Sequence, residues 1–226
     1  MHETRPNTTG FLFCVRWLLS FFWPQKIARS KPGEEYLELI LYRGRKLVDS
    51  KNANYSYGNL QTAYIGLFRQ LDIDWTACND VLVLGFGVGG VSSLMQQKNP
   101  SLRQIGVEYN SQMIEWYTDF FVQINQLQLV HEDAHEYVKS CEMFFDVIVV
   151  DLFTDLSVEP RFQSSEFLAL VKKCLTANGV LIYNKVSKSS EQNLEYQSLV
   201  LTCSSLFRRV KVIEQMDINK FIICRK

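Results

Sequence analysis

Three acidic residues follow an apolar run in the second half of the chain, and their spacing suits proton-transfer chemistry. Asp151 comes directly after Phe145–Val150, and Asp155 and Glu159 follow within the next eight residues. Such a run is typical of a buried strand, and ligands bind a parallel sheet at the carboxyl ends of its strands. We therefore expect Asp151 to be a catalytic residue that accepts a proton or orients a lone pair. A solvated acidic loop is the alternative, and it is most credible for Glu159.

A glycine-rich segment indicates where a ligand is held. The sequence GFGVGG at 85–90 lies between an apolar stretch and a helical pattern, and glycine permits both a sharp turn and a close approach of ligand to the main chain. Gly85, Gly87 and Gly90 fit the GxGxxG pattern of dinucleotide-binding proteins. With Gly89 in place of Gly90, the segment fits the GxGxG pattern of adenosyl-sulfonium enzymes. The glycines therefore predict a nucleotide-type ligand without choosing between these two, and a tight structural turn is the alternative.

Two further acids end the next two expected strands. Glu108 lies 19 residues after Gly89, where a carboxylate accepts hydrogen bonds from both ribose hydroxyls of such a ligand. Asp133 suits an adenine pocket because it can accept from the exocyclic amine, and the following Ala134 leaves room for the ring. Asp133 is also a good N-cap for the helix expected after it. Both roles are compatible. For Glu108 the alternative is a surface position at a strand end.

Alternating strand and helix patterns position these residues on a sheet. The expected helices are 89–98, 111–124, 134–141, 163–175 and 190–206. The expected strands are 81–84, 104–107, 127–130, 145–150, 180–183, 210–214 and 221–224. This alternation predicts a mostly parallel, seven-stranded α/β sheet covered by helices on both faces. Only MDIN separates the last two strands, which is too short for a crossover, so the final strand must be antiparallel. A Rossmann-like sheet of this kind resembles the class I adenosylmethionine-dependent methyltransferase fold.

The N-terminal part is expected to hold two small elements before the main domain. We assign residues 1–30 to an apolar helix and residues 58–226 to the ligand-binding domain. Residues 31–57 between them are expected to form a small β-hairpin unit that turns at Arg43-Gly44. The apolar run 11–23 is too short for a membrane span, which needs about 20 residues, and the segment PQKIARS after it offers a poor cleavage site for a signal peptide. We expect this run to pack on its own domain or on the partner of a homodimer. An interfacial membrane helix is the alternative, because the run is rich in Trp and Phe.

Composition restricts the partners and the compartment. Lys and Arg number 24 and Asp and Glu 24, so the chain has no net charge to attract nucleic acid. The six cysteines have long, irregular gaps and form no metal-ligand pattern with the three histidines. We therefore expect no metal, free thiols in a reducing, cytoplasmic compartment, and a small-molecule substrate read by a local pocket.

The order of these motifs resembles the spermidine synthase family of polyamine aminopropyltransferases. The features that carry the resemblance are GxGxG, a strand-end acid, Asp-Ala, FDVIVVD, an acidic loop with Pro160, Glu166-Phe167 and GVLIYN. The resemblance covers roughly residues 35–226. It implies an adenosyl-sulfonium-binding transferase domain in which Asp151 orients and deprotonates the attacking amine. It also implies that Glu108 and Asp133 hold the ribose and adenine of decarboxylated S-adenosylmethionine, the co-substrate.

The acceptor side departs from the family. The segment NANYSYGNL keeps Tyr55 and Tyr57 but has no acid, and Asp155 stands one position away from the family's second acid. By the resemblance, Asp155 and Glu159 would hold the distal ammonium of an amine substrate, with Tyr57 packing against its methylenes. Because this side matches poorly, the alternatives are a methyltransferase that uses S-adenosylmethionine and a nucleoside-binding pseudoenzyme. A dehydrogenase is disfavoured by the terminal antiparallel strand.

Overall fold

The chain divides into two compact units, Met1–Gly58 and Asn59–Lys226. The computed structural model describes residues 10–31, 35–50, 54–56, 59–153, 158–216 and 219–226. The domain boundary expected from the sequence lies between residues 57 and 58, one residue before the boundary between these two units.

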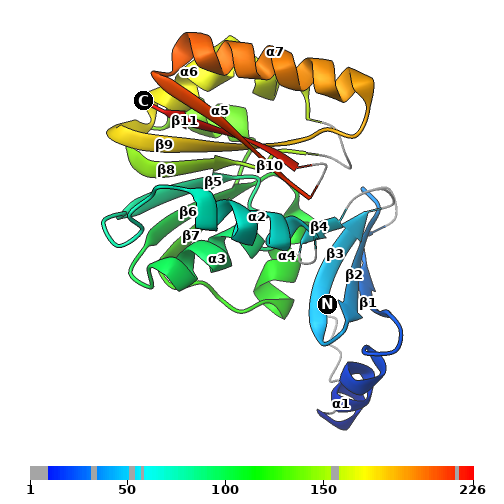
Figure 1. Ribbon diagram of the computed structural model, residues 1–226. Coiled ribbons are helices and arrows are strands. Elements are labelled where there is room, and N and C mark those ends of the chain that lie inside the picture. Colours follow the sequence, from blue (N-terminus) through cyan, green and yellow to red (C-terminus); the bar gives the residue numbers. More distant parts are fainter. Residues whose placement is uncertain (1–9, 32–34, 51–53, 57–58, 154–157, 217–218) are drawn as a thin grey trace. The chain divides into compact units, whose positions relative to one another are not determined.

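Seven strands of the larger unit form one twisted sheet in the order β10-β11-β9-β8-β5-β6-β7 (Figure 1). Their bounds are β5 Asp80–Leu84, β6 Arg103–Glu108, β7 Leu127–His131, β8 Phe145–Val150, β9 Leu175–Val186, β10 Arg209–Gln215 and β11 Asn219–Arg225. β5 to β9 run parallel to one another, whereas β11 is antiparallel to both β9 and β10. The predicted α/β fold with a reversed last strand is therefore confirmed.

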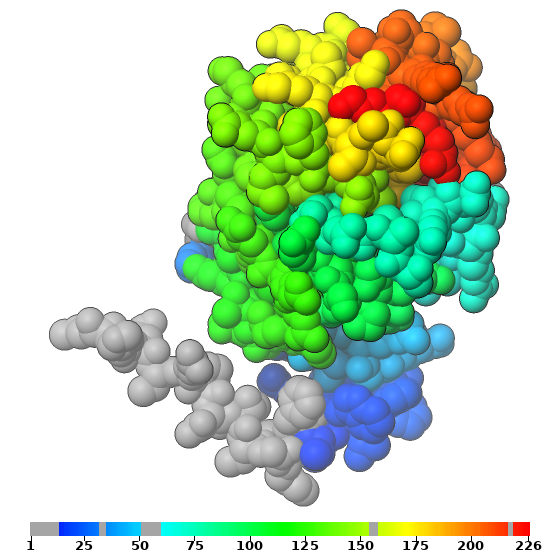
Figure 2. Space-filling model, turned by 90° about the vertical axis from the view of Figure 1, so that its left-hand side faces the viewer, coloured from blue at the N-terminus to red at the C-terminus, as the bar shows by residue number. Residues whose placement is uncertain are grey.

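Helices cover both faces of this sheet, as predicted. They are α2 Asn59–Gln70, α3 Gly90–Lys98, α4 Ser111–Phe120, α5 Ala134–Ser140, α6 Ser165–Lys173, α7 Ser190–Leu206 and the short 3-10 helix η1 Pro160–Gln163. Alternate residues of β5 point to opposite faces. Leu82 joins an apolar core with α5, α6 and α7, whereas Val83 joins a core with α2 and α3. Figure 2 shows the last residues of the chain, in red, packed beside yellow and orange segments that precede them.

β9 is the strand whose extent the sequence analysis underestimated. It runs over 12 residues, Leu175–Val186, whereas the apolar pattern predicted only 180–183. The missed residues include Asn184 and Lys185, which are polar yet almost fully buried. Lys185 pairs with Glu195 at 2.6 Å, and Asn184 bonds to the side chains of Asp151, which follows β8, and of Asn219 in β11. Polar partners therefore replace the apolar pattern by which a buried strand is recognised.

The smaller unit holds the helix α1 Gly10–Leu19 and a four-stranded antiparallel sheet. The strands, in sheet order, are β1 Gln25–Arg29, β2 Leu37–Tyr42, β3 Arg45–Ser50 and β4 Asn54–Ser56. Arg43 and Gly44 both have positive φ, 49° and 72°, as a two-residue hairpin turn of the predicted kind requires. The sequence assigned residues 1–30 to a helix, but α1 ends at Leu19. The chain then turns at Pro24, and residues 25–29 form β1, which pairs with β2.

Among the described residues we searched for membrane-spanning helices, metal-binding groups and disulfides. None of their helices is long and apolar enough to cross a bilayer. They contain no group of three or more His, Cys, Asp and Glu side chains arranged to hold a metal ion. All six cysteines are free, and five of them are buried, whereas Cys14 is exposed.

Candidate active site at the carboxyl edge of the sheet

The glycine loop connects β5 to α3 and lies against the end of β8. Gly85 has φ of +85°, and a Cβ atom at this position would collide with the main-chain carbonyl oxygen of Asp151. The Asp151 amide also donates to the Leu84 carbonyl at 2.9 Å. Only glycine allows this conformation and this approach. The fold thus brings Asp151 directly beside the loop predicted to hold the ligand.

Gly87 and Gly89 have different reasons for being glycine. Gly89 precedes α3 with φ of +80°, and its Cβ would press into the side chains of Phe86 and Tyr117, so this glycine serves packing. Gly87 also has positive φ, but no atom lies within 4 Å of the position its Cβ would take. Gly90 likewise has no atom within 4 Å of its Cβ position, so open space lies at both Gly87 and Gly90, and a bound nucleoside could approach the main chain there.

Glu108 is held by main-chain amides of the same edge. Its Oε2 accepts from the Gly87 N–H at 2.7 Å, and its Oε1 accepts from the Asn110 N–H at 2.8 Å. The side chain is half-buried. A carboxylate at the end of this strand is the type of group that accepts hydrogen bonds from ribose hydroxyls. This arrangement fits the predicted contact with a pair of ribose hydroxyls.

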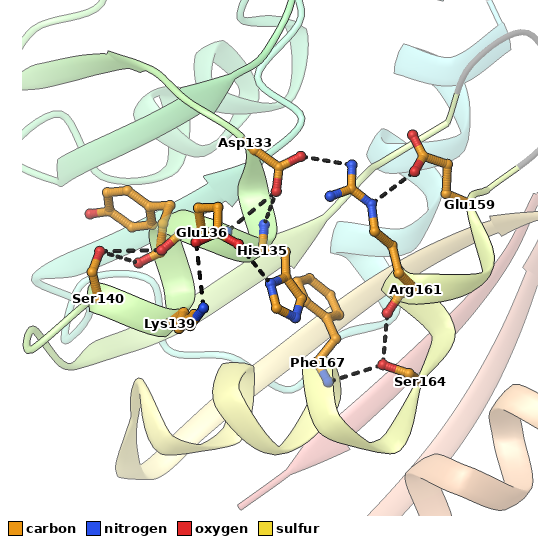
Figure 3. Close-up of polar contacts among 10 residues, drawn as sticks. Asp133, His135, Glu136, Lys139, Ser140, Glu159, Arg161, Ser164 and Phe167 are labelled. Atoms are coloured by element: carbon orange, nitrogen blue, oxygen red, sulfur yellow. Dashed lines mark hydrogen bonds and ion pairs between the residues drawn. The ribbon is translucent and has the colours of Figure 1, made fainter.

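Asp133 caps α5 and also forms an ion pair (Figure 3). Its Oδ1 accepts from the His135 and Glu136 amides at 2.9 and 3.3 Å, so the capping role is present. Its Oδ2 accepts from Arg161 of η1 at 2.7 Å. Ala134, beside it, is buried in the apolar core. An adenine amine would share the Asp133 carboxylate with Arg161, a residue that the sequence analysis did not consider.

Glu159 is the other partner of Arg161. The Arg161 Nε donates to its Oε2 at 2.8 Å, so one guanidinium joins Glu159 to Asp133 (Figure 3). Glu159 is exposed, and in this arrangement its charge is already paired. Tyr57 and Asp155, the other two residues expected on the acceptor side, lie outside the described residues.

Asp151 is the buried carboxyl of this edge. Its exposed fraction is 8%, and its Oδ1 accepts from the Asn184 amide of β9 at 2.7 Å. Burial raises the pKa of Asp151 to about 6, although the Asn184 and Tyr64 side chains oppose the rise. A carboxyl with this pKa is mostly ionised at pH 7 and is suited to accept a proton.

Asn184 and Tyr64 act directly on Asp151, and Asn219 contacts Asn184. None of the three was assigned a role from the sequence. Asn219 of β11 donates to the Asn184 oxygen at 3.3 Å, which fixes the orientation of that amide. Tyr64 of α2 is fully buried, and its hydroxyl has no hydrogen bond of ordinary geometry within the described chain. Burial and the charge of Asp151 raise the pKa of Tyr64 well above its usual value. One signal was present in the sequence: Asn184 directly follows the apolar run at 180–183.

The fold defines a class, the proteins with a class I methyltransferase-type sheet. The structure resembles human methyltransferase-like protein 13 in complex with SAH, with a TM-score of 0.63 and 23% identity over 74% of this chain and 82% of that one. Residues 73–216 match the family described as the spermine/spermidine synthase domain. The chain belongs to this family.

Two curated relatives differ in the reaction their names describe. A probable polyamine aminopropyl transferase of Bifidobacterium longum is 26% identical over 129 residues, 57% of this chain and 29% of the relative. An eEF1A lysine and N-terminal methyltransferase homolog of Drosophila melanogaster is 27% identical over 156 residues, 64% of this chain and 23% of the relative. The chain thus spans less than a third of either relative's length.

Proposed function

We propose that this protein transfers an aminopropyl group from decarboxylated S-adenosylmethionine to an amine acceptor. The observation that carries the proposal is the position of Asp151, a buried carboxyl with a pKa near 6 directly beside the glycine loop. The family supports it, since the chain belongs to the spermine/spermidine synthases.

The co-substrate would be held by the nucleoside side of the edge. Its ribose hydroxyls would donate to Glu108, whose carboxylate already lies on the Gly87 amide. Its adenine amine would donate to Asp133, and the open space at Gly87 would admit the nucleoside next to the main chain. These positions fit an adenosyl compound without a change in the glycine loop.

The reaction is an in-line displacement at carbon. A bond forms between the amine nitrogen and the transferred carbon, the bond from that carbon to the sulfonium sulfur breaks, and a neutral thioether leaves. The amine must also lose one proton, and Asp151 would accept it. Positioning the two reactants accounts for most of the remaining catalysis.

The acceptor is less defined than the co-substrate. Because Glu159 shares the Arg161 guanidinium with Asp133, part of its charge is already paired, and it would attract a distal ammonium less strongly than an unpaired carboxylate would. We keep Asp155 and Tyr57 as proposed acceptor contacts. We also propose that the protein works in the cytoplasm, a reducing compartment that suits its six free thiols.

Methyl transfer from S-adenosylmethionine is the second candidate. The similarity to the Drosophila relative favours it, because that name describes methylation of lysine and N-terminal amines. Both candidates use a sulfonium co-substrate and an amine acceptor, so Asp151 would have the same role in each.

A two-by-two assay separates the candidates. The protein is incubated with either S-adenosylmethionine or its decarboxylated form, and with either a panel of diamines and polyamines or peptides that carry free lysine and N-terminal amines. Aminopropylated amine with the decarboxylated compound supports the proposal. Methylated product alone supports the second candidate, and tight nucleoside binding without any product supports a pseudoenzyme.

A further inference from the structure

A patch of exposed aromatic and aliphatic side chains lies in α1 and the turn that follows it. Trp17, Leu18, Phe21, Phe22 and Trp23, hereafter the aromatic patch, are all exposed, and Phe22 is 79% exposed. Isolated apolar residues on a surface are ordinary, but five within seven positions form a contiguous surface that marks a site of interaction.

The aromatic patch is held in place by the hairpin of the same unit. The buried Ser20 hydroxyl donates to the Trp17 carbonyl at 2.6 Å and accepts from the Gly44 amide at 2.9 Å. The Arg43 amide donates to the Ser20 carbonyl at 2.8 Å. The Trp17 and Phe21 rings meet edge to face, with centroids 4.8 Å apart. The turn is therefore preorganised, and the exposure of its rings does not result from fraying.

The charge around the aromatic patch is positive. Residues 10–31 include Arg16, Lys26, Arg29 and Lys31 and no acid, and of these Lys26 pairs with Glu38 of β2. The hairpin turn that contacts Trp17 carries the exposed Arg43 and Arg45. The unit 1–58 contains nine Lys and Arg against five Asp and Glu, whereas 59–226 contains 15 against 19. The zero net charge of the chain thus conceals a unit of +4 and a unit of −4.

We propose that the N-terminal unit binds an anionic lipid surface through the aromatic patch. Trp and Phe side chains favour the boundary between headgroups and acyl chains, and basic residues beside them are attracted to acidic lipids. α1 has only 10 residues, so it would lie in the interface and not span the bilayer.

Charge also disfavours a second copy of the chain as the occupant. A two-fold dimer would place the same patch of each copy at one interface. The basic residues that surround the patch, Arg16 and Arg43 among them, would then face their own equivalents, and like charges in an interface are unfavourable. An anionic surface meets the same residues with opposite charge.

Vesicle sedimentation tests the proposal. We expect the protein to bind vesicles of phosphatidylcholine with about 30 mol% phosphatidylserine at least about ten-fold more tightly than phosphatidylcholine alone. The double variant Phe22→Ser/Trp23→Ser should lose this binding. Leu194→Ser/Leu201→Ser is the matched control, because it removes two equally exposed apolar side chains from α7 and should bind as wild type does. Equal binding by wild type and the patch variant would overturn the proposal.

Tryptophan fluorescence provides a test without mutation. Trp17 and Trp23 are exposed, whereas Trp75 and Trp116 are buried. Anionic vesicles should shift the emission of wild type to the blue, and brominated lipids should quench it. No shift and no quenching, together with a concentration-dependent dimer by light scattering that the patch variant abolishes, would show that a second copy covers the patch.

Discussion

The nucleoside side and the reacting side of the sheet edge hold their carboxylates in different ways. Glu108 is half-buried and accepts from two main-chain amides, one of them in the glycine loop. Asp151 is buried and is contacted by side chains from distant segments, Asn184 and Tyr64. The position of Glu108 is therefore set by the backbone, whereas the pKa of Asp151 is raised by burial and lowered by its side-chain partners. We expect substitutions on the two sides to affect different properties.

Asp151→Asn should have the largest effect and should separate the two sides. The variant keeps the shape but cannot accept a proton, so turnover should fall by a factor on the order of 10²–10⁴. Binding of the co-substrate, measured by calorimetry, should remain. If the variant instead loses nucleoside affinity and retains turnover per bound complex, Asp151 belongs to the binding side.

Gly87→Val should affect binding first. The new side chain would fill the open space at this position, so nucleoside binding should be abolished while the circular dichroism spectrum stays native. Gly87→Ala is the matched control, because it carries a similar backbone strain with a smaller side chain and should lose less affinity. If both variants bind the nucleoside as tightly as wild type does, the nucleoside does not bind at this loop.

Glu108→Ala and Asp133→Ala should each weaken co-substrate binding by about 1–3 kcal/mol, since each leaves a polar group of the ligand unpaired. Titration calorimetry measures the effect. Arg161→Ala serves as the control for Asp133, because it frees Oδ2 and keeps the helix cap. If Asp133→Ala reduces only the melting temperature, Asp133 acts as a cap and does not bind adenine.

The pH dependence of stability tests the burial of Asp151. The pKa of Asp151 is about 6 in the folded protein against an ordinary value of 3.8 for this side chain, so the folded state binds more protons between these two pH values. This carboxyl therefore lowers the free energy of unfolding as pH rises from 4 to 6, by at most about 3 kcal/mol. Asp151→Asn should be more stable than wild type above pH 6, and the difference should vanish below pH 4. Denaturant titrations at both pH values measure it.

Tyr64→Phe should have the smallest effect and affect only the reacting side. The loss of the hydroxyl removes a group that favours the ionised carboxylate, so the pKa of Asp151 should rise above about 6. Infrared titration of the carboxyl measures this directly, and the acid limb of the rate profile should move the same way. Gly87 and Glu108 are unchanged, so nucleoside affinity should be too. An unmoved pKa would show that Tyr64 only packs against its apolar neighbours.

The elements that depend on local backbone patterns were predicted well from the sequence. The helix 190–206 was assigned at its observed bounds, and the glycine loop and the reversed last strand follow from local patterns. Tyr64, Asn184 and Arg161 were not anticipated. Each acts through contact with a residue far away in the chain, and the pattern around each resembles ordinary core or loop. Local patterning specifies elements, but it does not specify which side chains meet between them.

The position of β11 in the sheet affects how the protein is made. This strand pairs with β9 on one side and β10 on the other, and Phe221 within it packs against Tyr64 at a centroid distance of 4.9 Å. A ribosome must therefore synthesise residues 219–225 before the sheet can close, and until then β9 and β10 present unpaired edges that are prone to aggregation. Asn219 also belongs to this strand. A nascent chain thus acquires the support of its reacting carboxyl at the same moment that it completes its core.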